Sequence, residues 1–220
     1  MLDRAKLDEI ILKNDVKDWW IPELFVQNTK PIFPSELEIL ADPPAEAKNH
    51  NCFAYALGFA DKLELVVQTN GFDDLYFIKL LENNELEKTD SPVDGDYVIY
   101  QDLEDYPDRL THIGVLDGDK VISKWAWGPL VRHSLWDVPA SYGNDVFYVK
   151  AISFERSLEL YNQYKDSIER INPQWFYFPL PAQWNHFLPY CLKQTLASLN
   201  QSRHNSSNWF HPRSRSRPRK

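Results

Sequence analysis

The sequence contains few of the residues on which several protein classes depend. It has 2 cysteines, 7 glycines and 1 methionine among 220 residues. It also lacks any apolar run near the roughly 18 to 20 residues that cross a bilayer, so we expect no membrane association. Cys52 and Cys191 lie far apart, which argues against a disulfide framework. The chain has no repeat of fixed period and no glycine-rich phosphate loop, which disfavours solenoid arrays and nucleotide hydrolysis.

Acidic residues are absent from the last 50 positions, which hold 7 lysines and arginines. Residues 1–170 carry all 32 acidic residues with 17 basic ones, a net charge of −15. This main part would repel phosphates, so only the basic tail is a candidate contact for nucleic acid, the alternative being a solvated tail. The N-terminus mixes charges with apolar residues, unlike the continuous apolar stretch of a secretory signal, and we therefore expect a cytoplasmic protein.

Composition and proline spacing divide the chain into four expected segments. The 43% hydrophobic content is enough for a substantial core. Leu2 to Asn14 has the spacing of an amphipathic helix, and the prolines between Trp19 and Ala45 predict an extended arm with short turns. The expected segments are a helix and proline-rich arm at 1–45, an α+β domain at 46–172, an aromatic and proline-rich extension at 173–200, and a disordered Ser/Arg-rich tail at 201–220.

Within the central segment, helices come first and a sheet follows. Asn51 is a good N-cap for a helix over 51–58, and a second helix is expected over 72–81 and a third over 154–171. Five short β-rich runs, separated by turn residues, predict an antiparallel meander at 97–100, 110–116, 120–125, 130–135 and 146–152. The predicted architecture is α+β, with a cysteine-bearing helix packed on a curved antiparallel sheet.

Cys52 falls in the first turn of its predicted helix. Free backbone amides at that position lower the pKa of a thiol and favour the nucleophilic thiolate. His112, on a predicted strand beside the small Gly114, is the best candidate for the base that such a sulfur needs. A buried, inert cysteine and an ordinary strand histidine are the alternatives when either residue is taken alone.

Three short motifs occur in the order found in one hydrolase family. They are Asn51-Cys52-Phe53-Ala54-Tyr55-Ala56, Pro92-Val93-Asp94-Gly95-Asp96-Tyr97, and Thr111-His112-Ile113-Gly114-Val115. Together they resemble the NlpC-type papain-like cysteine hydrolases, over roughly residues 45–150. The resemblance implies a papain-like fold and thiol-based cleavage or transfer at an amide or ester bond. Cys52 would be the nucleophile, and His112 would first accept and then donate a proton, with a peptide or other amide-containing substrate.

The family usually adds a third polar residue on the strand that follows the histidine. Here that strand offers Ser123 and Lys124, neither of which is a usual partner for imidazole, and His133 is a further candidate. Asn51 and Trp125 are our candidate substrate contacts, although a tryptophan in so aromatic a chain is commonly a core residue.

Other uses of these residues are less well supported. His50 is a second candidate base. A metal site built from His50, Cys52, His112 and His133 matches no compact zinc spacing, so we expect no metal and no cofactor. The main alternative function is a non-catalytic module that binds a protein or another ligand on the same fold.

Overall fold

The structure is a computed structural model, and it describes residues 2–13, 16–45, 50–62, 74–105 and 107–168. The chain divides into two units, residues 1–175 and 176–220, and all described residues belong to the first. Cys191, the extension at 173–200 and the basic tail therefore lie outside the described residues. In the described part no helix is long and apolar enough to cross a membrane.

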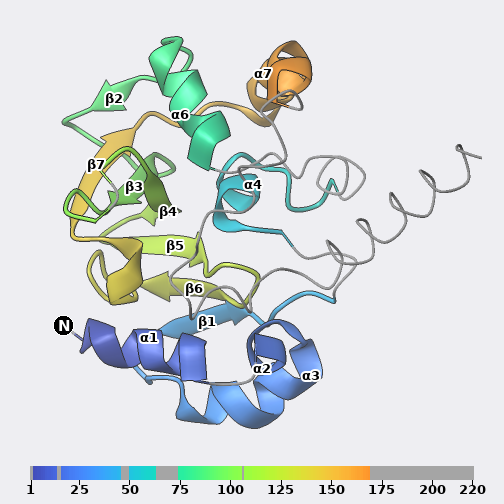
Figure 1. Cartoon of the computed structure of the whole chain (residues 1–220), viewed down its shortest axis with the longest axis vertical. Coiled ribbons are helices and arrows are strands. Elements are labelled where there is room, and N and C mark those ends of the chain that lie inside the picture. The colour runs from blue at the N-terminus through green and yellow to red at the C-terminus, as the bar shows by residue number, and fades with distance from the viewer. Residues whose placement is uncertain (1, 14–15, 46–49, 63–73, 106, 169–220) are drawn as a thin grey trace, which may run out of the picture. The chain divides into compact units, whose positions relative to one another are not determined.

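A seven-stranded, fully antiparallel sheet forms the centre of the first unit (Figure 1). Its order is β1-β6-β5-β4-β3-β7-β2, so β3 to β6 are a meander, and β7 crosses back to pair with β3. The strands are β1 (Glu38–Ala41), β2 (Lys88–Thr89), β3 (Tyr97–Gln101), β4 (Leu110–Asp117), β5 (Lys120–Lys124), β6 (Leu130–His133) and β7 (Asp145–Val149). The sheet does not close, and this mixture of helices with an antiparallel sheet is the expected α+β class.

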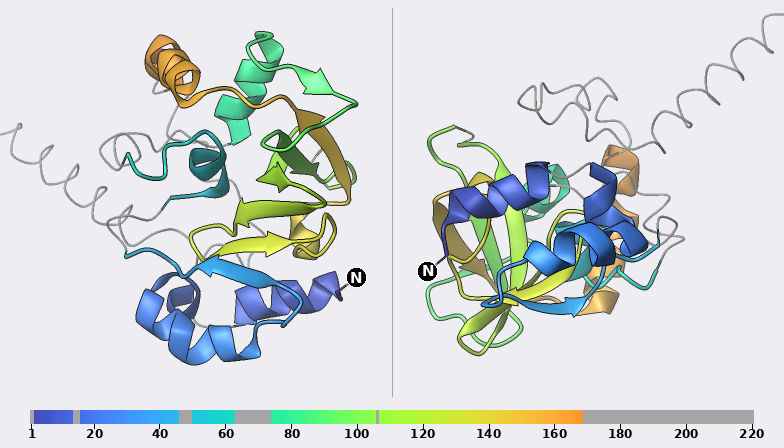
Figure 2. Two further views of the ribbon diagram at one scale, coloured as in Figure 1. Left: turned by 180° about the vertical axis from the view of Figure 1, so that it is seen from behind. Right: turned by 90° about the horizontal axis from the view of Figure 1, so that it is seen from below.

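Helices cover both faces of the sheet, and each face has its own apolar cluster (Figures 1 and 2). Alternation along β3 separates them: Tyr97 and Ile99 point to the first cluster, Val98 and Tyr100 to the second. The first cluster contains residues of α4 (Cys52–Ala56), α6 (Asp74–Glu82) and α7 (Phe154–Ile168). The second contains residues of α1 (Arg4–Lys13), α2 (Val16–Trp20) and η1 (Phe25–Thr29).

The N-terminal segment differs from the extended arm expected between Trp19 and Ala45. It forms a run of short helical turns, α2, α3 (Pro22–Leu24), η1 and η2 (Lys30–Ile32), before the edge strand β1. Pro22 and Pro31 occupy the first or second position of a turn, where a missing N–H removes no helical hydrogen bond. The prolines therefore divide this segment into short helical turns without making it extended.

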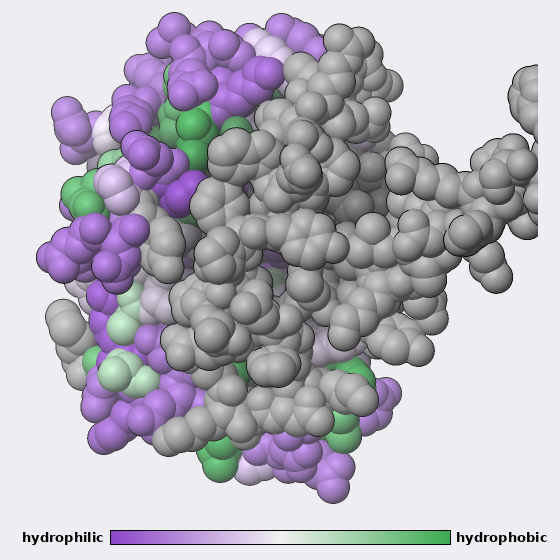
Figure 3. Space-filling model, in the orientation of Figure 1, coloured by the Kyte–Doolittle hydropathy of each residue, from purple (hydrophilic) through white to green (hydrophobic). Residues whose placement is uncertain are grey.

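Outward-facing residues are mainly polar. In the view of Figure 3 the described surface is largely hydrophilic, with small apolar areas between the charged side chains. Among the described residues, the exposed large apolar side chains are those of Val26, Ile32, Leu40, Val93 and Leu103.

The motif at 92–97 has a structural role at the start of β3. Gly95 adopts a left-handed φ of +94°, which favours glycine. The Asp96 carboxylate accepts hydrogen bonds from the N–H of Val93 at 2.9 Å and of Ala151 at 3.0 Å. The aspartate thus joins the turn before β3 to the chain that follows β7.

Gly114 sets the spacing of β4 and β5, and its replacement tests this packing. A Cβ at this position would overlap Val121 Cγ1 and lie 3.1 Å from Ser123 Cβ. We expect Gly114→Ala to lower the free energy of unfolding by about 1–3 kcal/mol, as overpacking of a core does, measured by urea denaturation. Adding Val121→Ala should recover part of that loss. A Gly114→Ala protein as stable as the parent would contradict this packing.

Candidate active site

Cys52 occupies the first position of α4, near the point where β4 and β5 diverge. Pairing of β4 with β5 runs over Val115–Asp117, and α4 contacts both strands (Figure 1). The Asn51 side chain caps the helix by accepting a hydrogen bond from the Ala54 N–H at 2.9 Å. The predicted cap and helix start are therefore confirmed.

The environment of the Cys52 sulfur combines donors with strong burial. The backbone N–H groups of Cys52, Phe53 and Ile113 hydrogen-bond to it and favour the thiolate. Burial opposes them and raises the pKa of the thiol to about 12, since the side chain is only 6% exposed. The sequence predicted a lowered pKa from the helix terminus alone. In this structure desolvation exceeds that effect, and Cys52 is a neutral thiol at pH 7.

His112 lies on β4 next to Ile113 but points the other way. Ile113 packs in the first cluster with Cys52, so His112 faces the second. Its ring stacks on Tyr142 at 3.9 Å between centroids and lies 5.6 Å from the ring of Tyr100. This differs from the expectation that His112 would face the helix. Tyr142 ends the turn η4 (Ala140–Tyr142) and belongs to the second cluster.

The imidazole of His112 is neutral and incompletely hydrogen-bonded. Burial, followed by the nearby charge of His133, holds its pKa well below the usual value. Its Nε2 is buried and has no hydrogen-bond partner in the described part of the chain. A buried ring nitrogen without a partner is uncommon in folded proteins, and it leaves this atom available to a further group.

Two of the three candidate third residues bind each other. His133 Nδ1 lies 2.8 Å from the Ser134 carbonyl, which can only accept, so Nδ1 carries the proton. The other nitrogen, Nε2, then accepts from Ser123 Oγ at 2.9 Å, and Ser123 in turn accepts from Trp125 Nε1 at 3.0 Å. Neither residue hydrogen-bonds to His112 within the described residues. This hydrogen-bond network joins the side chain of Ser123 on β5 to that of His133 on β6.

The third candidate, Lys124, lies on the opposite face of β5. Val115 pairs with Ile122 and packs against the first cluster, and Lys124 follows Ile122 by two residues. By alternation its side chain points toward the α4 side. It is 2% exposed, and its Nζ donates a hydrogen bond to the Gly128 carbonyl. Burial lowers the pKa of its amine to about 7, while interaction with Cys52 raises it.

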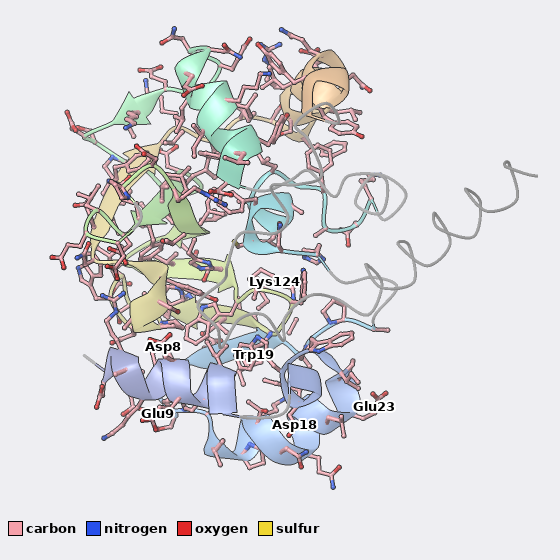
Figure 4. All side chains as sticks on the ribbon, in the orientation of Figure 1. Asp8, Glu9, Asp18, Trp19, Glu23 and Lys124 are labelled. Carbon is pink, nitrogen blue, oxygen red and sulfur yellow. The ribbon has the colours of Figure 1, made fainter. Side chains whose placement is uncertain are left out.

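A tight turn over 125–129 holds this lysine in place. The Trp125 N–H bonds to the Pro129 carbonyl at 3.0 Å and the Gly128 N–H to the Trp125 carbonyl at 2.8 Å. Trp19 from α2 donates its indole N–H to the same Trp125 carbonyl at 3.1 Å. Figure 4 shows Trp19 beside the N-terminal helices and Lys124 between these helices and α4. The N-terminal segment therefore supports the site.

The remaining predicted residues have other surroundings. Trp125 is fully buried and packs against Trp19 and Phe33, the arrangement of a core residue. His50 stacks on Tyr55 at 6.4 Å. Among the described residues no three His, Cys, Asp or Glu side chains are grouped so as to hold a metal ion.

Sequence reasoning missed Tyr142 and Trp19, and it considered Lys124 only as a possible third member beside His112. Both aromatic residues are distant in sequence from Cys52 and His112 and belong to no motif. The alternation of Ile122 and Lys124 on the predicted strand was a usable signal for the facing of the lysine.

The two buried histidines predict a loss of stability in mild acid. Burial holds the folded pKa of His133 at about 4 and that of His112 well below its usual value. Between the folded and unfolded pKa values the unfolded chain binds more protons, so stability decreases as the pH falls below about 6.5. Each histidine contributes a slope of up to about 1.4 kcal/mol per pH unit.

Urea unfolding at pH 7, 6 and 5 measures this slope. His133→Gln, which removes one titrating group, should reduce the slope by up to one proton. A free energy of unfolding that is constant from pH 7 to 5 would contradict the burial of these neutral imidazoles.

Comparison with known proteins identified no relative of this chain. No protein-family model, no curated protein and no solved structure matches it.

Proposed function

We propose that this protein is a thiol hydrolase or acyltransferase with a papain-like fold, acting on an amide-type bond through Cys52 and His112. The observation that carries the proposal is the position of the Cys52 sulfur at the start of α4, where the N–H groups of Phe53 and Ile113 point at it. Ile113 directly follows His112 on β4, which brings the backbone of the histidine strand to the sulfur.

The reaction class follows from what these groups can do. The Cys52 thiolate would attack a carbonyl carbon, and the amine would leave as a thioester forms on the sulfur. Backbone N–H groups beside the sulfur are suited to the negative charge that develops on the carbonyl oxygen. His112, a neutral imidazole, would act as the acid–base group when water or another acceptor releases the acyl group, a role that requires its ring to turn from Tyr142 in the second cluster toward Cys52.

Turnover of simple acyl compounds tests the proposal. The full chain would be assayed against acyl p-nitrophenyl esters and short peptide p-nitroanilides, since both release a chromophore when an acyl group is transferred. We expect catalytic turnover of at least one compound that Cys191→Ser retains. Failure of the whole panel, with an intact fold, would count against a hydrolase of this class.

A non-catalytic binding module on the same fold is the second candidate function. The burial of Cys52 and His112, and the raised pKa of the thiol, favour it, because a catalytic thiol must be accessible and readily ionised. A folded protein whose Cys52 reacts no faster than an ordinary thiol would support this alternative.

A further inference from the structure

Polar contacts join α1 to the segment that connects β6 with β7. The Arg4 guanidinium donates to three backbone carbonyls of that segment, at 3.0 Å for the first two: those of Val138, Pro139 and Gly143. One turn further along the helix, the Asp8 carboxylate accepts from the backbone N–H of Ser141 at 3.1 Å and from its hydroxyl at 2.6 Å. Figure 4 shows Asp8 on the side of α1 that faces the sheet. We call these contacts of Arg4 and Asp8 the strap.

The segment held by the strap carries the ring that covers His112. Tyr142 stands in the chain between Ser141 and Gly143, both of which the strap binds directly. Its side chain is buried, whereas Ser141 is exposed, so the ring lies between His112 and the surface of the segment. The Tyr142 and His112 rings are parallel within 16° and 3.9 Å apart, closer than the 5.6 Å between His112 and Tyr100. The strap therefore fixes the ring that holds His112 in the second cluster.

The polar strap is separate from the apolar anchors of α1. Leu7 and Ile11 are buried in the second cluster and dock the helix on the sheet. The strap lies nearer the surface, since Ser141 is exposed and the side chains of Arg4 and Asp8 are half-buried. Hydrogen bonds in reach of water open at a lower free energy than those of a buried sheet. The segment can therefore open locally while α1 stays docked.

Resting on the proposed function, we propose that the strap is an autoinhibitory contact, which keeps His112 stacked on Tyr142 and away from Cys52 until it opens. Cys52 packs in the first cluster with Ile113, so the stacked imidazole is on the wrong face of β4 for the acid–base step. Opening of the strap withdraws Tyr142 and frees the imidazole to turn. The strap and the stacked rings thus form a two-state element of the kind that controls other enzymes.

Modification by diethylpyrocarbonate measures the release of His112. The reagent acylates a neutral imidazole nitrogen, and Nε2 of this residue has no hydrogen-bond partner in the described part of the chain. The full chain would be compared with Asp8→Ala and Arg4→Met, and the modified residues located by peptide mass spectrometry. We expect the rate at His112 to rise about tenfold in either variant, as the loss of one or two hydrogen bonds predicts. His133, with both ring nitrogens bonded, should keep the parental rate.

Two further variants of the N-terminal segment are controls. Lys6→Ala is the matched one, because the Lys6 side chain is 76% exposed and forms its ion pair with Asp3, just before α1. It should leave the reactivity of His112 unchanged. Asp8→Asn keeps an oxygen that can accept from Ser141, and it should retain most of the protection that Asp8→Ala loses.

Hydrogen exchange in the parent protein gives a second measurement if a strap variant fails to fold. The N–H groups of Tyr142 and Gly143 bond to the Pro139 and Ala140 carbonyls within the turn. They should exchange faster than the N–H groups of β3, because the segment opens without unfolding of the sheet. Exchange of both sets at one common rate would overturn local opening of the strap.

Turnover separates this inference from the proposed function. For an ester that the parent hydrolyses, kcat should rise in Asp8→Ala with KM unchanged, because only the fraction of molecules with a released His112 increases. Parental reactivity of His112 in folded Asp8→Ala and Arg4→Met overturns the strap, whatever the turnover. Raised reactivity without a rise in kcat overturns autoinhibition and leaves the Cys–His hydrolase standing. Turnover absent from the parent and from every variant with a reactive His112 overturns the hydrolase itself.

Discussion

Cys52→Ala is expected to abolish turnover of any ester or amide that the parent protein hydrolyses, by at least about 10⁴-fold, while the protein remains folded. The size of this effect follows from the proposed covalent step, for which no other described residue supplies a sulfur nucleophile. The cost in stability should be small, about 1 kcal/mol, because the change removes one buried atom and only the weak N–H···S hydrogen bonds of Ile113 and Phe53.

The controls for Cys52→Ala separate chemistry from folding. Cys191→Ser should retain full turnover, and both variants should keep the parental circular dichroism and urea midpoint within about 1 kcal/mol. Residual turnover above one hundredth of the parental rate in a folded Cys52→Ala protein would show that the sulfur is not the nucleophile.

Gly128→Ala should cause the largest loss of stability, about 3 kcal/mol. A Cβ there would overlap Trp19 Cε2 and Nε1 and lie 2.8 Å from Cζ2. The ring has little freedom to move, because it is 1% exposed, packs against Phe25 and Trp125, and is held by its indole hydrogen bond. Gly128 also supplies the carbonyl that accepts the hydrogen bond of the buried Lys124 amine.

Two variants show whether this loss arises from the overlap. Adding Trp19→Phe to Gly128→Ala reduces the ring and should recover part of the stability, measured by urea denaturation. Ala126→Gly lies in the same turn, at a left-handed φ of +49°, and should stabilise the protein by about 1 kcal/mol. A Gly128→Ala protein with parental stability would contradict the close packing of Trp19 on this turn.

Local signals allowed most elements of the sheet domain to be predicted. The alternation of apolar residues identified β3 to β7, and Asn51 with Gly58 marked the limits of the cysteine helix. Such patterns are set by neighbours in the sequence, so they are readable without a structure. The return of β7 to pair with β3, and the pairing of β1 with β6, depend on contacts between distant segments and were not predicted.

Fewer properties of the candidate site could be predicted from the sequence. A helix terminus predicts a lowered pKa for Cys52, but the degree of burial, which reverses the shift, depends on the packing of the whole first cluster. Alternation places His112 and Ile113 on opposite faces of their strand, but which of these faces the cysteine helix covers depends on the packing of distant segments. The stacking of Tyr142 on His112 brings together residues 30 positions apart and had no sequence signal.

Formation of a thioester on Cys52 is the most direct test of the central claim that this residue is a nucleophile. The full chain carrying Cys191→Ser would be mixed with p-nitrophenyl acetate, quenched in acid within the first turnover, and mapped by peptide mass spectrometry, beside a urea-unfolded sample. We predict acetylation of Cys52 in the folded protein, faster than in the unfolded chain and reversed by neutral hydroxylamine. Acetylation confined to other residues, or faster at Cys52 after unfolding, would contradict the account.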